Sequence, residues 1–212
     1  MQTIPTREEL YAALCERHGE ELQKRFDKAC VAVCGLGGLG SNIAVSLARA
    51  GVGRLILIDF DRVDISNLNR QQYSISQLGM YKTEALKNTL MSFSPYSDIT
   101  IHTVRITGDN MSELLNDAEI ICEALDNPEQ KALLVNGVSE QLPEKYLVAA
   151  SGMAGLGSSN TIKTRRVTKR FYLCGDEQSD ISDGGLISAR VMLCAAHQAN
   201  MILRIIAGES EV

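Results

Sequence analysis

The stretch Ala29-Cys-Val-Ala-Val-Cys-Gly-Leu-Gly-Gly-Leu-Gly-Ser41 determines the expected fold, because it joins a short apolar run to a glycine-rich turn. The run is β-prone, and the turn has the spacing Gly-x-Gly-x-x-Gly at Gly35, Gly37 and Gly40. After Ser41, apolar residues recur at helical spacing. Glycines at such a turn let backbone N–H groups approach a phosphate, and the start of the helix adds a favourable dipole. The stretch therefore predicts a nucleotide-binding turn between a strand and a helix.

A second apolar run follows this helix at residues 55–58 and ends at Asp59. The order strand, turn, helix, strand is that of a βαβ unit, and both runs are apolar on both faces, as in a parallel sheet covered by helices. Asp59 lies 19 residues after Gly40, where a carboxylate can hold the hydroxyl pair of a ribose. These features predict a nucleotide, and by themselves they favour a nicotinamide cofactor.

The rest of the chain continues to alternate between helices and strands. The expected helices are residues 82–93, 111–116, 128–140 and a long C-terminal helix, and the expected strands are 99–104, 120–125 and 146–150. Residues 160–173 hold two β-prone runs without a helix between them, which predicts antiparallel strands near the C-terminus. We therefore expect an α/β fold with a Rossmann-like, doubly wound, mostly parallel sheet and antiparallel strands toward the C-terminus.

No linker or internal repeat divides the sequence, so we expect residues 1–212 to form a single domain. An N-terminal helical arm is expected over about residues 1–28, since residues 7–28 are polar and helix-forming. The long C-terminal helix presents an apolar stripe that we interpret as core or dimer surface. The residues of the stripe are Val191, Cys194, Ala195, Gln198, Met201, Ile202 and Ile205.

The composition is that of an ordinary globular protein, with 45% hydrophobic and 22% charged residues. A net charge of -5 argues against a general nucleic-acid binder, and we interpret the cations between Lys163 and Arg170 as a solvated strand and loop. Residues 186–207 carry charged and polar side chains that argue against a membrane span. The six cysteines include no Cys-x-x-Cys pair, which favours a reducing, cytoplasmic setting and predicts no zinc site.

The segment Ser66-Asn-Leu-Asn-Arg-Gln71, followed by Lys82, distinguishes ATP from a nicotinamide cofactor. A dehydrogenase has no need for an arginine and a lysine close behind the ribose carboxylate, whereas a protein that binds a nucleoside triphosphate does. Arg70 offers a bidentate fork, Lys82 a point charge and Asn67 an amide donor. Together these three side chains are suited to the β- and γ-phosphates of ATP.

Asp126 ends a predicted central strand, at the same carboxyl edge of the sheet as the glycine turn and Asp59. A carboxylate at this edge can hold a Mg²⁺ ion that bridges phosphate oxygens. The alternative is that Asp126 and Asn127 only cap the helix that begins at Pro128. We favour magnesium because of the phosphate-binding residues already described.

Together these segments resemble the ThiF–MoeB–HesA family, the bacterial relatives of ubiquitin-activating enzymes. The resemblance covers nearly the whole chain, and its segments are residues 35–41, 59–61, 66–72, Lys82, 124–127, 151–155 and 195–199. The compact length is most similar to the short ThiF-like proteins linked to thiamine biosynthesis.

The resemblance implies a role for each residue singled out above. It implies that Gly38 and the neighbouring glycines line the nucleotide pocket, that Asp59 binds the ribose and that Asp126 binds Mg²⁺. The residues that it implies at the phosphates are Asn67, Arg70, Gln71 and, near the α-phosphate, Lys82. The residues expected to be catalytic are Arg70, Lys82 and Asp126.

The implied reaction is the adenylation of a protein's C-terminal carboxylate. A small ubiquitin-like sulfur-carrier protein of the ThiS type would present its carboxylate to the α-phosphorus of ATP, and pyrophosphate would leave with Mg²⁺. The acyl-adenylate would then receive sulfur from a separate donor protein. Because a carboxylate is a poor nucleophile, catalysis of this kind rests on positioning and charge neutralisation.

The family also inserts an N-terminal arginine from a partner subunit, which implies a homodimer and makes Arg17 or Arg25 the candidate. Many relatives hold a structural zinc with two Cys-x-x-Cys pairs, and this chain has no such pair. Some relatives use a loop cysteine in covalent transfer. Cys174 lies in the corresponding region, and a structural or incidental cysteine is at least an equal alternative.

Three other interpretations remain open. Some relatives adenylate a modified adenosine in tRNA in order to cyclise it, and the net charge argues mildly against this. An NAD-dependent oxidoreductase needs a hydride-transfer acid or base, and none of the histidines lies beside a pocket motif in the sequence; they are His18, His102 and His197. A non-catalytic nucleotide-dependent protein would not need the phosphate-side residues Arg70 and Lys82 or the carboxylate of Asp126.

Overall fold

The computed structural model describes residues 4–180, 182 and 184–212. Within them, the chain forms a seven-stranded sheet with the order β3-β2-β1-β4-β5-β7-β6. The strands are β1 (Cys30–Cys34), β2 (Arg54–Ile58), β3 (Asp98–His102), β4 (Ile120–Glu123), β5 (Tyr146–Ala150), β6 (Lys163–Arg166) and β7 (Phe171–Gly175). Neighbouring strands are parallel except for β6 and β7, which are antiparallel. The predicted α/β fold, with a mostly parallel sheet and an antiparallel end, is confirmed.

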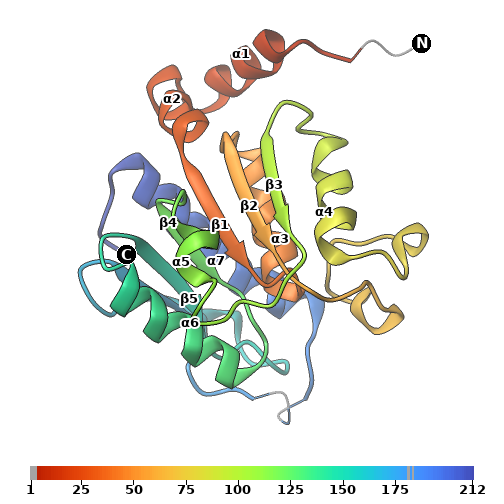
Figure 1. Cartoon of the computed structure of the whole chain (residues 1–212), viewed down its shortest axis with the longest axis vertical. Coiled ribbons are helices and arrows are strands. Elements are labelled where there is room, and N and C mark those ends of the chain that lie inside the picture. The colour runs from red at the N-terminus through yellow and green to blue at the C-terminus, as the bar shows by residue number, and fades with distance from the viewer. Residues whose placement is uncertain (1–3, 181, 183) are drawn as a thin grey trace.

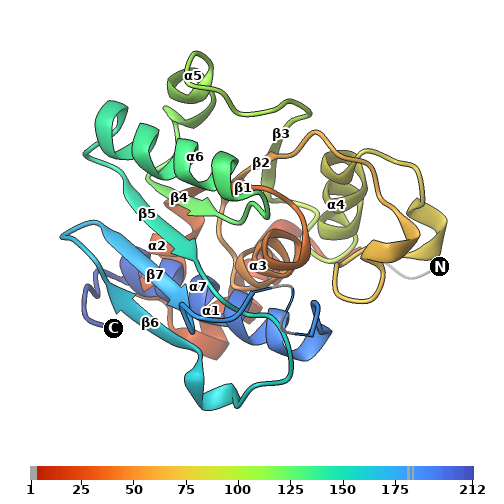
Figure 2. The same ribbon diagram turned by 90° about the horizontal axis from the view of Figure 1, so that it is seen from below.

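Helices cover both faces of the sheet (Figure 1). They are α1 (Arg7–His18), α2 (Glu20–Lys28), α3 (Gly38–Arg49), α4 (Lys82–Met91), α5 (Met111–Leu115), α6 (Pro128–Gln141) and α7 (Ser188–Ala207). The view in Figure 2 shows α5 and α6 on one face of the sheet and α3 and α7 on the other. Each face has its own apolar core, one shared with α3, α4 and α7 and the other with α5 and α6. The molecule is thus a three-layer α/β/α sandwich.

The chain changes direction across the sheet at β1. This strand pairs with β2 on one side and with β4 on the other, and all five of its residues are buried. The βαβ unit predicted around the glycine turn is present, with α3 as its crossover helix. At the switch, Cys34 of β1 and Glu123 of β4 are partners in the register. Open α/β sheets bind ligands outside the carboxyl ends of the strands at such a point.

The N-terminal stretch expected to be helical is divided into two helices. Gly19, with a φ of 92°, ends α1 and precedes α2. Figure 1 shows both helices at the end of the sheet where β1 begins, away from the carboxyl ends of the strands. There Arg25 donates a hydrogen bond to the Ala207 carbonyl at the end of α7, and Arg17 is exposed. Residues 1–3 of the expected arm lie outside the described part of the chain.

The apolar stripe of α7 belongs to the core of its own chain. Val191, Cys194 and Ile202 are at most 2% exposed, and α7 packs against α3 and the sheet. Of the two alternatives for the stripe, core or dimer surface, the structure therefore supports the core. In the described part of the chain, no helix combines the length and apolar character needed to cross a membrane.

Candidate functional site

The glycine-rich turn between β1 and α3 is tightly packed at two of its glycines. Gly35 has a φ of 89°, and a Cβ built on it would lie 2.7 Å from the Ala124 carbonyl oxygen. A Cβ on Gly40 would lie 1.8 Å from the Gly35 carbonyl oxygen. The turn itself therefore requires glycine at both positions. A Cβ on Gly37 would lie 3.8 Å from its neighbour, the side-chain nitrogen of Gln71, so the turn is open on that side.

Asp59, which follows β2, holds this turn in place through hydrogen bonds. Its two carboxylate oxygens accept hydrogen bonds from the backbone N–H groups of Leu36 and Asp61, each at 2.7 Å. Tyr73 donates its hydroxyl to the Leu36 carbonyl at 2.7 Å. Burial raises the pKa of Asp59, and the nearby Lys82 charge and the two backbone hydrogen bonds oppose that rise. The structure places Asp59 beside the turn, and its contact with a ribose stays a prediction.

Lys82, the first residue of α4, is buried and paired with a carboxylate. Its Nζ lies 2.9 Å from Asp61 Oδ2, and the two side chains are 8% and 47% exposed. The Lys82 backbone N–H also donates to the Asp61 carbonyl at 2.9 Å. The sequence interpretation gave Asp61 no role of its own, although the pattern Asp59-Phe-Asp61 was visible. The structure therefore adds Asp61 as the residue that holds the predicted phosphate-side lysine.

Residues 66–72, which carry Arg70 and are called the strap below, are held against the first turns of α3 by hydrogen bonds. Asn42 donates its side-chain amide to the carbonyls of Gly38 and Arg70, at 2.6 and 3.0 Å. Gln72 donates its own amide to the Asn42 side chain at 2.7 Å. A Cβ built on Gly38 would lie 3.4 Å from the aliphatic stem of Arg70. The strap thus holds Arg70 and Gln71 against the glycine turn.

Two polar atoms on this strap are buried without a hydrogen-bond partner among the described residues. They are Nε of Arg70 and Oε1 of Gln71. Buried polar atoms are rarely left unpaired. Arg70 Nε is a donor suited to a phosphate oxygen, and Gln71 Oε1 is an acceptor suited to a hydroxyl group. A nucleotide offers both kinds of group. The unpaired acceptor of Gln71 suits a hydroxyl rather than the phosphate expected for it, and a contact of Gln71 with phosphate stays a prediction.

Asn67 is placed differently from its predicted role. Its Oδ1 accepts a hydrogen bond from the Asp64 backbone N–H at 3.0 Å, which caps the short helix at Ile65–Asn67. Arg70 Nη1 donates to the Ser66 carbonyl, also at 3.0 Å. Asn67 therefore shapes the strap through its oxygen, and a contact of its amide nitrogen with phosphate stays a prediction.

Asp126 lies in the turn between β4 and α6 and is exposed. Asn127 caps α6 by accepting a hydrogen bond from the Gln130 N–H at 3.0 Å. The helix-capping alternative therefore applies to Asn127. The preceding residues of this turn pack on the glycine turn, since a Cβ on Gly35 would lie 3.0 Å from Leu125. Asp126 is thus held near the glycine turn with its carboxylate at the surface.

The donor set is compatible with magnesium. Mg²⁺ keeps several waters and is commonly bound by one or two carboxylates together with substrate phosphates. The exposed carboxylate of Asp126 offers one such ligand. Within residues 4–180, 182 and 184–212, no three His, Cys, Asp or Glu side chains gather as a metal site. A metal at Asp126 would therefore depend on phosphate oxygens for its remaining ligands.

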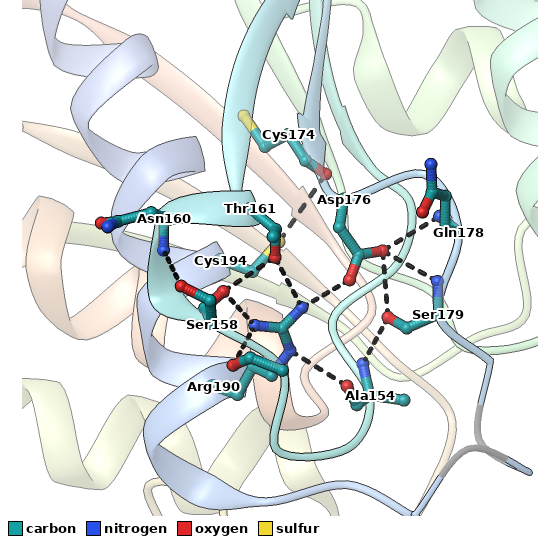
Figure 3. Close-up of polar contacts among 11 residues, drawn as sticks. Ala154, Ser158, Asn160, Thr161, Cys174, Asp176, Gln178, Ser179, Arg190 and Cys194 are labelled. Atoms are coloured by element: carbon teal, nitrogen blue, oxygen red, sulfur yellow. Dashed lines mark hydrogen bonds and ion pairs between the residues drawn. The ribbon is translucent and has the colours of Figure 1, made fainter.

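A cavity of about 630 Å³ lies between the loops after β5 and β7 and the start of α7. Figure 3 shows the polar network in its wall, with Arg190 at the centre. Arg190 is 7% exposed, and its guanidinium donates to the carbonyls of Ala154 and Gly157 and to the Asp176 carboxylate. Burial alone would raise the pKa of Asp176, but hydrogen bonds from Ser179, Gln178 and Arg190 lower it to about 2.

The first turn of α7 lies between the cavity and the glycine-rich turn. Arg190 lines the cavity, and a Cβ built on Gly38 would lie 2.9 Å from the side chain of the next residue, Val191. The strap reaches the same region, because Asn69 donates to the Leu186 carbonyl at 3.1 Å. The sequence interpretation missed Asp176 and Arg190. The available signal was Arg190, a charged residue next to Val191 at the start of the apolar stripe of this helix.

Cys174 is a buried residue of β7 and is 0% exposed. Burial raises the pKa of its thiol to about 11, and a contact with the Thr164 hydroxyl opposes that rise. Since the thiolate is the reactive form of cysteine, this environment favours the structural alternative over covalent transfer.

Two of the histidines have local partners, and the third lies nearer the glycine turn than the sequence suggested. His18 bonds Gln23, and His197 bonds the Thr164 hydroxyl. His102 ends β3, and its carbonyl accepts a hydrogen bond from the Asp59 N–H at 3.3 Å. A backbone carbonyl cannot act as a hydride-transfer acid or base, so the expectation about the histidine side chains stays a prediction.

Comparison with known proteins identifies related sequences. Residues 11–212 match the model of the ThiF family. The chain is 32% identical over 193 residues to the adenylyltransferase and sulfurtransferase UBA4 of Candida glabrata, covering 88% of this chain and 44% of that protein. It is 29% identical over 202 residues to the adenylyltransferase and sulfurtransferase MOCS3 of Aedes aegypti, covering 92% and 45%. The chain thus spans less than half the length of these relatives.

Solved structures show the same fold at low sequence identity. The E. coli tRNA N6-threonylcarbamoyladenosine dehydratase in complex with ATP has a TM-score of 0.85 and 20% identity, covering 97% of this chain and 98% of that one. E. coli MccB with ATP has a TM-score of 0.70 and 22% identity, covering 89% and 60%. At these identities the likeness concerns the fold.

Proposed function

Because the chain belongs to the ThiF family, we propose that it uses ATP to adenylate the C-terminal carboxylate of a small ubiquitin-like carrier protein. The observation that carries the proposal is the pair of unsatisfied atoms at the glycine turn. Arg70 Nε and Gln71 Oε1 are a buried donor and a buried acceptor with no partner in the described chain. The neighbouring cavity supplies space for a second substrate.

ATP is proposed to lie across the carboxyl ends of β1, β2 and β4. Asp59 binds the ribose with the lone pairs that its two backbone hydrogen bonds leave free. Arg70 binds the phosphates with its Nε, and Gln71 accepts a hydroxyl group. Lys82 stays paired with Asp61 and adds its charge near the α-phosphate, where a compact ammonium group can neutralise developing negative charge. Asp126 holds Mg²⁺, which shields the phosphate charges.

The proposed reaction is a displacement at phosphorus. An oxygen of the carrier's carboxylate forms a bond to the α-phosphorus, and the bond from that phosphorus to the bridging oxygen of the pyrophosphate breaks. The leaving pyrophosphate takes the electron pair, so no proton transfer is required. The chain contributes by aligning the two substrates and by surrounding the phosphates with Arg70 and Lys82.

The carrier's C-terminal segment is proposed to enter through the cavity. Gly155, Gly157 and Gly175 line it, so an extended peptide meets little side-chain bulk at these positions. Arg190 donates hydrogen bonds to backbone carbonyls of the cavity loops, and these bonds fix the shape of the loops. Because Val191 contacts the glycine turn, a peptide that ends in this cavity lies close to the phosphates of ATP.

The finer assignments belong to the same proposal. We place the carrier in the ThiS-like class and the pathway in thiamine biosynthesis on the resemblance alone, with a separate protein as sulfur donor. We also propose a cytoplasmic homodimer in which Arg17 or Arg25 reaches the partner's site. Both arginines lie on helices at the other end of their own sheet. Arg17 is exposed there, whereas Arg25 already donates to the Ala207 carbonyl of its own chain, so Arg17 suits a role in a neighbouring subunit better than Arg25.

The test of this function is carrier-dependent exchange of labelled pyrophosphate into ATP. Purified chain is incubated with ATP, Mg²⁺, labelled pyrophosphate and each member of a panel of ubiquitin-like carriers. We expect exchange with at least one carrier and none without a carrier. Calorimetry with ATP and with NAD separates this proposal from the oxidoreductase alternative. Tight NAD binding without ATP binding would contradict it.

A second candidate is adenylation of a modified adenosine in tRNA. The observation that favours it is the row of cations on β6 and the β6–β7 turn, where Lys163 and Lys169 are exposed. Two members of the row are already neutralised, since Arg165 pairs with Glu177 and Arg166 with Glu211. Pyrophosphate release that depends on modified tRNA and not on a carrier would establish this alternative.

A further inference from the structure

An ion pair between a fully buried carboxylate and a partly exposed lysine stands next to the turn that carries Asp126. Glu123 is the last residue of β4 and is 0% exposed. One of its carboxylate oxygens accepts a hydrogen bond from the Leu125 backbone N–H at 2.8 Å, and the other lies 2.5 Å from Lys131 Nζ. The mechanism proposed above uses neither Glu123 nor Lys131.

Lys131 extends the pair to the neighbouring strand. It lies in α6, and its Nζ donates a second hydrogen bond to the carbonyl of Ala150, the last residue of β5. The loop that begins after Ala150 leads to the cavity. The two side chains therefore connect the end of β4, the start of α6 and the end of β5 at the edge of the sheet where Asp126 lies.

Stability alone gives little reason for this pair. The Glu123 carboxylate is removed from water completely, and the Lys131 side chain keeps 28% of its exposure. Burying a charge in this way is costly, and replacing a buried ion pair by well-packed apolar residues is often neutral or stabilising. Burial raises the pKa of Glu123, which reflects this penalty, and Lys131 and the Leu125 N–H oppose the rise. What the pair provides, and apolar side chains would not, is a directed hydrogen bond to the backbone immediately before Asp126.

We propose that Glu123 and Lys131 are positioning residues for Asp126. Glu123 and Lys131, called the clamp below, hold the Leu125 N–H and the start of α6 in place. The Asp126 carboxylate thereby keeps one orientation toward the phosphate site. This inference rests on the proposed adenylation, in which Asp126 acts on the phosphates. Lys131 orients Glu123, Glu123 fixes the turn, and neither contacts the substrates.

The test compares Lys131→Met and Lys131→Arg with a control in the same helix, Leu134→Ala. Leu134 is fully buried on α6, so its truncation weakens the packing of the helix without touching the clamp. The first measurement is hydrogen exchange at the Leu125 amide. The second is the kcat and the KM for ATP in carrier-dependent pyrophosphate exchange, and melting curves accompany both.

We expect Lys131→Met to lower the protection of the Leu125 amide and to reduce kcat by about tenfold or more, the range typical of lost supporting contacts. The KM for ATP should stay within about twofold, because ground-state binding keeps its own contacts. Lys131→Arg keeps a positive charge at this position, so it should retain most of the Leu125 protection and most of the kcat. Leu134→Ala should lower the melting temperature while leaving Leu125 protection and kcat near those of the wild type.

Two results would overturn the inference. One is a Lys131→Met protein with wild-type Leu125 protection, and the other is a Leu134→Ala protein with the same loss of kcat. If Lys131→Met does not fold, the double variant Glu123→Gln/Lys131→Met replaces it, since it leaves no unpaired buried charge. If the wild type shows no exchange with any carrier, the proposed function fails, and Leu125 protection alone then decides whether the clamp exists.

Discussion

Three carboxylates stand at the carboxyl ends of β2 and β4, the two strands on either side of β1, and their surroundings suit them to different tasks. Asp59 is bound by two backbone N–H groups, and Glu123 is bound by Lys131 and the Leu125 N–H. Asp126 is exposed. The sequence singled out Asp59 and Asp126 because each follows an apolar run. It did not reveal Glu123, because this residue lies within the strand and its partner is on the next helix.

Asp126→Asn should reduce adenylation far more than it weakens ATP binding. The amide keeps the shape of the side chain and leaves the Asn127 cap intact, so the fold should survive. It loses the negative charge that holds Mg²⁺ where charge builds on the departing pyrophosphate. The expected loss is about 3 kcal/mol of transition-state stabilisation, or roughly a hundredfold in rate. The measurements are pyrophosphate exchange, ATP affinity and a melting curve, and near-wild-type exchange would remove Asp126 from the catalytic residues.

At the scale of elements, the sequence predicted the helices and strands that have a clear local pattern of apolar residues. The parallel strands were visible because β1, β2, β4 and β5 are apolar on both faces. The break at Gly19 was missed, because a polar helical stretch tolerates a glycine without changing its pattern. The cavity was also missed. Its central pair, Asp176 and Arg190, comes from different elements and meets only when the loops fold around α7.

Gly35→Ala should destabilise the protein much more than Gly79→Ala. The two glycines share a strained backbone, with φ values of 89° and 82°, which costs an alanine about 1 kcal/mol or more at either position. Only the alanine at position 35 would also meet a backbone oxygen at 2.7 Å, whereas Gly79 has nothing within 4 Å of its built Cβ. We expect a total loss of about 3 kcal/mol or more for Gly35→Ala. Equal urea midpoints would contradict the packing described for the turn.

Asp176→Asn should make the free energy of unfolding less dependent on pH in the acid range. The folded-state pKa of Asp176 is about 2, below its ordinary value of 3.8. A depressed pKa contributes stability above the ordinary value, and that contribution disappears as the pH falls through the folded value. The difference in unfolding free energy between wild type and variant should therefore be largest at neutral pH and shrink between pH 3.8 and about 2. A difference that is constant over this range would show that the ion pair does not stabilise the cavity loops.

At the scale of the molecule, we predict a homodimer. The basis is the resemblance, in which each site borrows an N-terminal arginine. In addition, the helices that carry Arg17 and Arg25, α1 and α2, lie away from the carboxyl ends of the strands of their own chain (Figure 1). The interface has to lie elsewhere than the apolar stripe of α7, because that stripe packs in the core. Light scattering at micromolar concentration with ATP present should give the mass of two chains. The mass of one chain would contradict the prediction.

The central claim is that a free protein carboxylate attacks ATP at this site. The most direct measurement compares pyrophosphate exchange with one carrier in two forms, its natural C-terminal carboxylate and the same carrier with that carboxylate converted to an amide. Both forms have the same surface, so docking is matched and only the nucleophile differs. We predict exchange with the carboxylate form and none with the amide. Equal exchange with both forms, or exchange with neither while modified tRNA drives pyrophosphate release, would contradict the account.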